Sequence, residues 1–155
     1  MMVMAFICAV MAWLIVAWVD YKVLEINPYW LSLACFASVV ALVSATPDAW
    51  GVALDHLAGG AVGLVAGLGV YIVHHRGMGQ GDIGLFGAMF CVGGLDHMIY
   101  TLVLFTGLAF ATTLFYSARR QKPFWRCGFP AALPAATTAI LMLFVTLGTE
   151  ALLYA

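Results

Sequence analysis

Charged residues are scarce in this sequence of 155 residues. Lys, Arg, Asp and Glu together make up 8% of the chain, whereas hydrophobic residues make up 65%. Soluble globular domains carry roughly 25% charged residues. A net charge of −1 and the lack of a basic patch argue against nucleic-acid binding. The composition therefore predicts an integral membrane protein that is surrounded by the lipid bilayer.

Closely spaced cysteines are also lacking. The four cysteines form no C-x-x-C pair, because they lie far apart at Cys8, Cys35, Cys91 and Cys127. Zinc and disulfide frameworks need paired cysteines, so we expect neither, and we assign no metal and no cofactor. We interpret these cysteines as small buried hydrophobic residues. The length predicts one integral-membrane domain over residues 1–155, without a soluble domain.

Uncharged stretches give the candidate membrane spans. Six stretches contain no Asp, Glu, Lys or Arg: residues 1–19, 28–47, 57–73, 83–95, 98–118 and 127–149. The first lacks the basic start and cleavage site of a signal peptide, so we expect a retained helix. A span needs about 20 residues, and the fourth stretch has 13. We therefore expect the fourth helix to begin before Asp82 or to continue beyond Asp96.

The positions of the basic residues favour six membrane crossings. If every stretch crosses, all basic residues fall on one side: Lys22, Arg76, Arg119, Arg120, Lys122 and Arg126. If the fourth stretch does not cross, Arg76 lies opposite the later cluster. The positive-inside rule therefore predicts an all-α bundle of six transmembrane helices. Both termini are expected outside, and the basic loops are expected in the cytoplasm.

The acidic residues divide between the two sides of this topology. Four are expected in solvated loops or helix ends on the outer side: Asp48, Asp55, Asp96 and Glu150. Three are expected on the cytoplasmic side: Asp20, Glu25 and Asp82. Asp20 ends the first helix and Asp82 opens the fourth, so their carboxylates can meet at one membrane depth. Two adjacent carboxylates share a proton, and aspartic proteases use such a pair to activate water.

Asp82 belongs to the stretch GMGQGDIGL, in which Gly79 and Gly81 precede it. Glycines lack a Cβ atom, so the backbone can bend here and let a substrate strand approach. The pattern G-x-G-D alone is a weak signal. Its position at a cytoplasmic helix start, opposite Asp20, makes a functional role more specific. In the competing interpretation, Asp82 is a helix N-cap and Asp20 is a helix-end acid solvated near the headgroups.

The segment that follows the first helix resembles a motif of the type IV prepilin leader peptidases. The similarity is to the small single-domain form associated with tight-adherence (Flp) pili. The family motif is D-x-R/K-x-x-x-I-P-N, and this sequence matches it at Asp20, Lys22 and Ile26. Asn27-Pro28 stands where the family has Pro-Asn.

The second motif of that family, G-x-G-D-x-K-L, is matched at Gly79, Gly81, Asp82 and Leu85. Gly84 stands where lysine is usual. Residues 126–134 are similar to the proline-containing entry into the family's last helix. The resemblance thus covers both aspartates and the six-helix layout.

The resemblance implies an aspartyl endopeptidase of the bacterial inner membrane with Asp20 and Asp82 as its catalytic pair. Its substrate would be a prepilin, from which it would remove the short basic leader at the cytoplasmic face. Gly79, Gly81 and Lys22 would belong to the substrate-binding loops. We expect Glu25 to attract the basic leader, because it is the only acid on that side outside the pair. The N-methyltransferase activity of larger relatives is not expected, since their cysteine-containing insertion is missing.

Two other functions stay open. Asp82 could relay a proton or bind a cation in a small transporter. Both acids lie at one membrane edge, and the outer half lacks an evident polar path, which argues against transport. The protein could also be an inactive scaffold of pilus assembly, and the departures at Gly84 and Asn27-Pro28 are the reason to consider this.

Simpler structural interpretations cover the remaining patterns. Most aromatic residues near the span ends are expected to form an interfacial belt: Trp13, Trp18, Tyr29, Trp30, Trp50, Tyr100 and Tyr116. The third stretch contains small residues at helical spacing, which predicts close helix packing: Gly59, Gly60, Gly63 and Gly67. His56 and His97 are expected on the outer side and belong to no motif.

Overall fold

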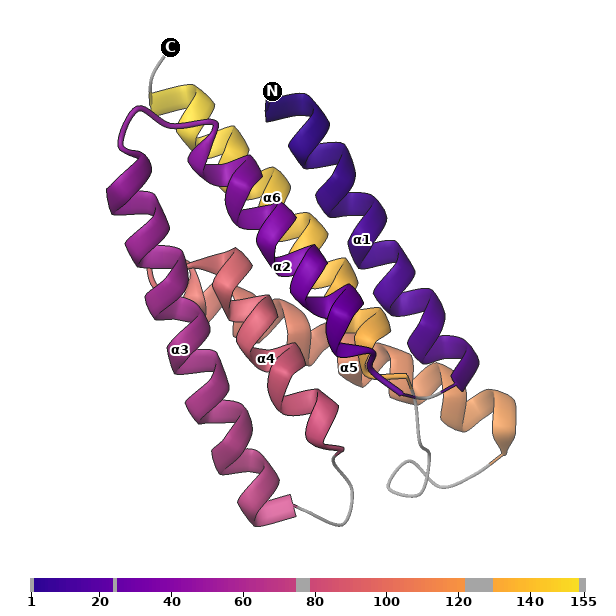
Figure 1. Cartoon of the computed structure of the whole chain (residues 1–155). Coiled ribbons are helices and arrows are strands. Elements are labelled where there is room, and N and C mark those ends of the chain that lie inside the picture. The colour runs from indigo at the N-terminus through magenta and orange to yellow at the C-terminus, as the bar shows by residue number, and fades with distance from the viewer. Residues whose placement is uncertain (1, 24, 75–78, 122–129, 154–155) are drawn as a thin grey trace.

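All regular secondary structure in the described part of the chain is helical (Figure 1). The computed structural model describes residues 2–23, 25–74, 79–121 and 130–153. Six helices follow one another: α1 (Met2–Val23), α2 (Pro28–Val43), α3 (Ala49–His74), α4 (Gln80–Gly93), α5 (Met98–Arg120) and α6 (Ala132–Leu153). Among them α1, α3, α5 and α6 are long and apolar enough to cross a membrane. The prediction of an all-α fold is confirmed, and these four helices have the length and composition expected of membrane spans.

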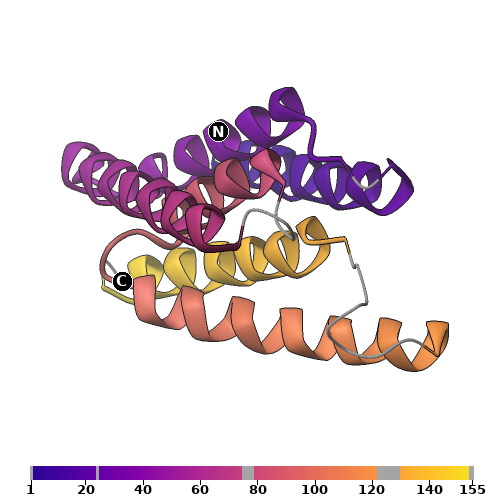
Figure 2. The ribbon, with the colours of Figure 1, turned by 90° about the horizontal axis from the view of Figure 1, so that it is seen from below.

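The short helix α4 lies inside the bundle. It packs against α2, α3, α5 and α6, and most of its residues from Leu85 onward are buried. Its 14 residues extend only about 21 Å, which is less than the thickness of a bilayer. Because neighbouring helices cover it, α4 does not need the length of a helix exposed to lipid. Helix α5 lies at the edge of the bundle beside α6, as Figure 2 shows.

Two helix starts explain features of the sequence. Helix α4 begins at Gln80, before Asp82, which is one of the two expected possibilities. It ends at Gly93, and Gly94 follows with a φ of 71°, a conformation that favours glycine. Helix α2 begins at Pro28 after the N-cap Asn27, whose side chain accepts a hydrogen bond from the Tyr29 N–H. The order Asn-Pro thus suits a helix start, since proline is favoured at the first helical position.

The glycines of α3 bring its backbone into contact with α4. A Cβ atom on Gly63 would lie 2.7 Å from the Phe86 carbonyl oxygen and 2.7 Å from Phe90 Cβ. A Cβ atom on Gly59 would lie 2.7 Å from the Phe90 carbonyl oxygen. The predicted packing role of these glycines is confirmed, because a larger residue would force the two helices apart.

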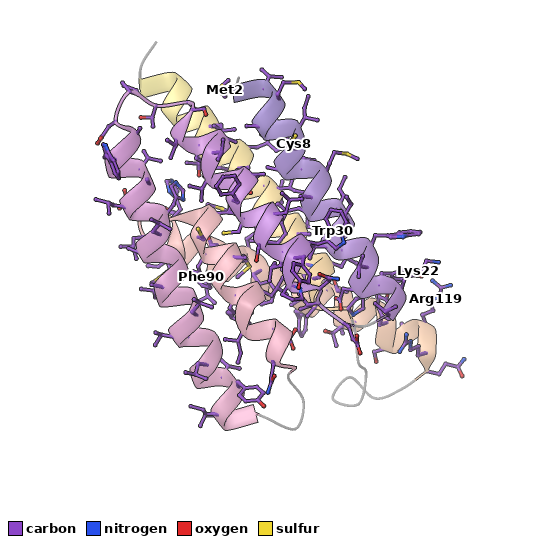
Figure 3. The ribbon with its side chains drawn as sticks, viewed as in Figure 1. Met2, Cys8, Lys22, Trp30, Phe90 and Arg119 are labelled. Atoms are coloured by element: carbon purple, nitrogen blue, oxygen red, sulfur yellow. The ribbon has the colours of Figure 1, made fainter. Side chains whose placement is uncertain are left out.

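Two expectations about single residues are wrong. Trp13 is fully buried and donates a hydrogen bond from Nε1 to Ser38 Oγ at 3.1 Å, so it is a core residue and not part of an interfacial belt. The indole N–H has a partner inside the bundle, which allows its burial. Cys8 is exposed on the outside of α1, whereas Cys91 is buried as expected (Figure 3). Cys127 lies outside the described residues.

The contact between α3 and α4 predicts a position-specific cost for a single methyl group. We expect Gly63→Ala to lower the free energy of unfolding by about 1–3 kcal/mol, because the site is already in van der Waals contact. Gly69→Ala is the matched control on the same helix, since no atom lies within 4 Å of its added Cβ. It should leave stability unchanged or raise it slightly through helix propensity. Unfolding of the detergent-solubilised proteins measures both, and equal stabilities would contradict the tight contact.

Candidate active site

Asp20 points into the protein although it lies in the last turn of α1. The buried residues of this helix follow one face at helical spacing: Ala9, Ala12, Trp13, Val16, Ala17 and Asp20. The Asp20 side chain is only 4% exposed, so it continues the core face of α1. This burial contradicts the interpretation of Asp20 as a solvated helix-end acid.

The first turn of α6 provides a partner for the buried carboxylate. Asp20 Oδ2 accepts a hydrogen bond of 2.8 Å from the N–H of Ala132, the first residue of α6. The first N–H groups of a helix have no partner within it, and its N-terminus carries partial positive charge. Pro130 precedes the helix and is buried, in agreement with a proline-containing entry. The earlier part of that expected entry, residues 126–129, lies outside the described residues.

Asp82 caps its own helix from the third position. Gly79 is the N-cap of α4, and its N–H donates a 2.8 Å hydrogen bond to Asp82 Oδ2. A side chain at the third helical position that accepts a hydrogen bond from the N-cap N–H is the second half of a capping box. Asp82 is therefore not the N-cap itself, although one of its oxygens contributes to capping. Its side chain is half-buried at the start of α4.

The fold brings the two aspartates close enough for their charges to interact. Asp20 on α1 experiences the charge of Asp82 on α4, although they lie 62 positions apart in the sequence. Both lie at the ends of their helices, where α1 ends and where α4 and α6 begin. Among the described residues, a backbone N–H binds one oxygen of each carboxylate. The arrangement thus combines a buried carboxylate with a more accessible one.

The two sequence motifs also contact each other directly. A Cβ atom on Gly81 would lie 2.9 Å from Ile26 Cβ, so the start of α4 touches the connection between α1 and α2. Ile26 therefore fills the space beside Gly81, and the missing side chain allows the motifs to approach. A Cβ atom on Gly79 would meet Asp82 Oδ2 at 3.7 Å, an ordinary contact. Gly79 is exposed and Gly81 is not.

Gly84 faces α2. A Cβ atom at this position would lie 3.3 Å from Leu31 Cδ2, and Leu31 is buried. A lysine side chain would start in this tight contact between α2 and α4. Glycine in place of the family's lysine thus allows close packing of α4 against α2. Gly84 and Ala88 are small residues four positions apart, a spacing that is typical of helix contacts.

Lys22 and Glu25 are exposed near the end of α1. The Lys22 ammonium lies 4.9 Å from the centre of the Trp18 ring, which is a cation–π contact. Arg119, in the last turn of α5, lies at the same end of the bundle (Figure 3). Three basic residues of the predicted cytoplasmic loops lie outside the described residues: Arg76, Lys122 and Arg126.

Comparison of the chain with protein-family models, with curated proteins and with solved structures finds no match.

The contact between the motifs predicts a different cost for the two glycines of G-x-G-D. We expect Gly81→Ala to lower the free energy of unfolding by about 1–3 kcal/mol, because its Cβ would overlap Ile26. Gly79→Ala should cost less than about 0.5 kcal/mol, since its Cβ has room and its position is exposed. Thermal unfolding in detergent compares the two variants. Greater damage by Gly79→Ala would contradict the packing of the motifs.

Proposed function

We propose that the protein is a membrane aspartyl endopeptidase that removes the short basic leader from type IV, Flp-like prepilins. The observation that carries this proposal is that the fold brings the motifs of buried Asp20 and half-buried Asp82 into contact, so that the charge of Asp82 acts on Asp20. Both residues belong to the motifs that resemble those of the prepilin peptidases. The direct contact of the two motifs through Ile26 and Gly81 supports a shared site.

The chemistry requires the pair to share one proton. The ionised carboxylate takes a proton from a water molecule while the oxygen of that water attacks the scissile carbonyl carbon. The protonated partner gives its proton to the carbonyl oxygen, which forms a tetrahedral intermediate. When the C–N bond breaks, the amine leaving group takes up a proton from one carboxyl group, and a hydroxyl group of the intermediate returns its proton to the other carboxylate, so the pair is again singly protonated. Two like charges in close proximity favour the singly protonated state that this sequence of steps requires.

The proposed topology places this site at the cytoplasmic edge of the bacterial inner membrane. Six crossings put both termini outside and the basic loops in the cytoplasm, in agreement with the positive-inside rule. In Figure 1 both termini lie at one end of the bundle, and the starts of α4 and α6 lie toward the other. A prepilin helix in the bilayer would then present its leader junction at the depth of Asp20 and Asp82.

The described contacts favour the peptidase over the two other functions. Buried apolar side chains of α4, those of Leu85, Met89 and Val92, separate Asp82 from the polar residues beyond Gly94. This separation argues against a proton or cation path through the bundle. The motif departures have packing and capping explanations, so they do not require an inactive scaffold.

Conservative replacements of the two aspartates test the proposal. We expect Asp20→Asn and Asp82→Asn each to lower leader removal by about 10³-fold or more, because neither amide can act as acid or base. Asparagine still accepts a hydrogen bond, so the contacts with Ala132 and Gly79 can persist. Mass spectrometry of a co-expressed leader-bearing pilin measures cleavage.

The unfolding midpoint of each asparagine variant serves as the control for insertion and folding. Cleavage should also continue in the presence of EDTA, because carboxylates and not a metal activate the water. Strong cleavage by either folded variant would overturn the catalytic pair, and loss of cleavage in EDTA would indicate a metal hydrolase.

Glu25 offers a separate test of leader recognition. We expect Glu25→Gln to lower cleavage of a basic leader by about 2–5-fold at low salt, the range of an exposed ion pair. The difference should shrink at high ionic strength through screening. A pilin with neutral residues in its leader is the matched control and should respond little. Equal losses on both leaders would exclude charge recognition by Glu25.

A further inference from the structure

Two cysteines that take no part in the proposed peptidase chemistry meet between α2 and α4. Cys35 lies on α2 and Cys91 on α4, and their thiols share a hydrogen bond. Both thiols are free, and Cys91 is 4% exposed whereas Cys35 is partly exposed. The sequence predicted separate buried hydrophobic residues, because these cysteines lie 56 positions apart. The fold instead brings their sulfur atoms together.

Helix packing holds the two cysteines in this position. Helices α2 and α4 pack against each other, and a Cβ atom on Gly84 would lie 3.3 Å from Leu31 Cδ2. Cys35 follows Leu31 by one helical turn and Cys91 follows Gly84 by two turns, so both belong to the faces in contact. Helix α3 supports Cys91 from another side, because a Cβ atom on Gly60 would lie 3.0 Å from Cys91 Cβ.

The surroundings of the two sulfur atoms favour a neutral product over a charged one. Helix α2 contains no charged residue, and the one charged residue of α4, Asp82, lies nine positions before Cys91. Thiolates, alone or around a metal ion, would add charge to these surroundings at a large energetic cost. Among the described residues, no group of three or more His, Cys, Asp or Glu side chains is placed to hold a metal ion. A disulfide bond is neutral and avoids that cost.

Only one of the two thiols has to be accessible to an oxidant. Cys35 is partly exposed and lies in the middle of the apolar helix α2. In the topology proposed above, the hydrocarbon chains of the bilayer surround this position. An oxidant that reaches Cys35 is therefore soluble in lipid, and quinones are two-electron oxidants of this kind. Buried Cys91 does not need to meet the oxidant, since its thiol already contacts that of Cys35.

We propose that Cys35 and Cys91 form a reversible disulfide bond, with a lipid-soluble quinone as the oxidant. The Cys35 sulfur bonds to the quinone, and the proton of this thiol moves to a quinone oxygen. The Cys91 sulfur then attacks the Cys35 sulfur, as in thiol–disulfide exchange. The bond between Cys35 and the quinone breaks, and its electron pair and the Cys91 proton pass to the quinone. The two thiols are thereby oxidised, and the quinone is reduced to a quinol.

The disulfide bond makes the contact between α2 and α4 dependent on the redox state of the membrane. Ile26 precedes α2 and Gly81 belongs to α4, so the bond ties together two elements whose first residues meet at the candidate active site. Along α4, Cys91 lies about 14 Å from Asp82. The disulfide therefore does not depend on the proposed peptidase activity.

Peptide mass spectrometry of the full chain in detergent tests the pair without any cleavage assay. The protein is reduced, freed of reductant without oxygen and mixed with a short-chain benzoquinone whose ring carbons are fully substituted. Free thiols are then blocked with N-ethylmaleimide in denaturant. We expect most chains to lose two hydrogen atoms and to contain the Cys35–Cys91 disulfide, and dithiothreitol to restore both thiols. Cysteines that stay reduced, or a quinone that stays bound to Cys35, would overturn the proposal.

A relocated thiol tests whether the packing contact selects the pair. Cys8→Ala and Cys127→Ala remove the other cysteines from all the chains compared. The matched control combines Cys35→Ala with Phe36→Cys, because Phe36 lies at the same depth of α2 and is 69% exposed. This more accessible thiol should give no disulfide to Cys91, since successive helical residues point in different directions. An equal disulfide yield in the control would overturn the assignment, and the unfolding midpoint of each variant verifies folding.

Discussion

A carboxylate inside an apolar helix bundle must receive hydrogen bonds, and this requirement organises one end of the protein. Asp20 lies on the core face of α1 and meets the N–H of Ala132 at the start of α6. An unpaired charge there would be costly, so the contact fixes the end of α1 against the start of α6. The candidate site depends on this contact, because it holds the Asp20 side chain in a position where the charge of Asp82 on α4 acts on it.

The contact between α3 and α4 determines where the polar ends of α4 lie. Glycines at 59 and 63 let the two backbones touch, and α4 is enclosed as a result. An enclosed helix can be shorter than the bilayer is thick, since its neighbours and not lipid surround it. Asp82 near its start is therefore half-buried and Gly94 after its end is buried, next to residues of other helices.

The helices and their packing glycines could be predicted from the sequence because both signals are local. Uncharged runs reveal helices, and small residues at helical spacing indicate contact faces. Which residues contact each other between helices could not be predicted. Trp13 was expected at an interface, because a helix that is apolar on every side does not reveal which side faces the core. The pairings of Asp20 with Ala132 and of Gly81 with Ile26 depend on how the helices are rotated and shifted, which single-sequence patterns do not contain.

The capping box of α4 makes the candidate site part of a helix end. The Asp82 oxygen that accepts the Gly79 N–H stabilises the first turn of α4. Protonation of Asp82 makes its oxygens weaker acceptors, and a substrate that binds the same oxygen competes with the Gly79 N–H, so this hydrogen bond is weakened. The first turn of α4 is thereby less stable whenever Asp82 is engaged in this way. Engagement of Asp82 and fraying of the first turn of α4 are therefore coupled. The rate of hydrogen exchange at the Gly79 amide would report the state of the Asp82 carboxylate.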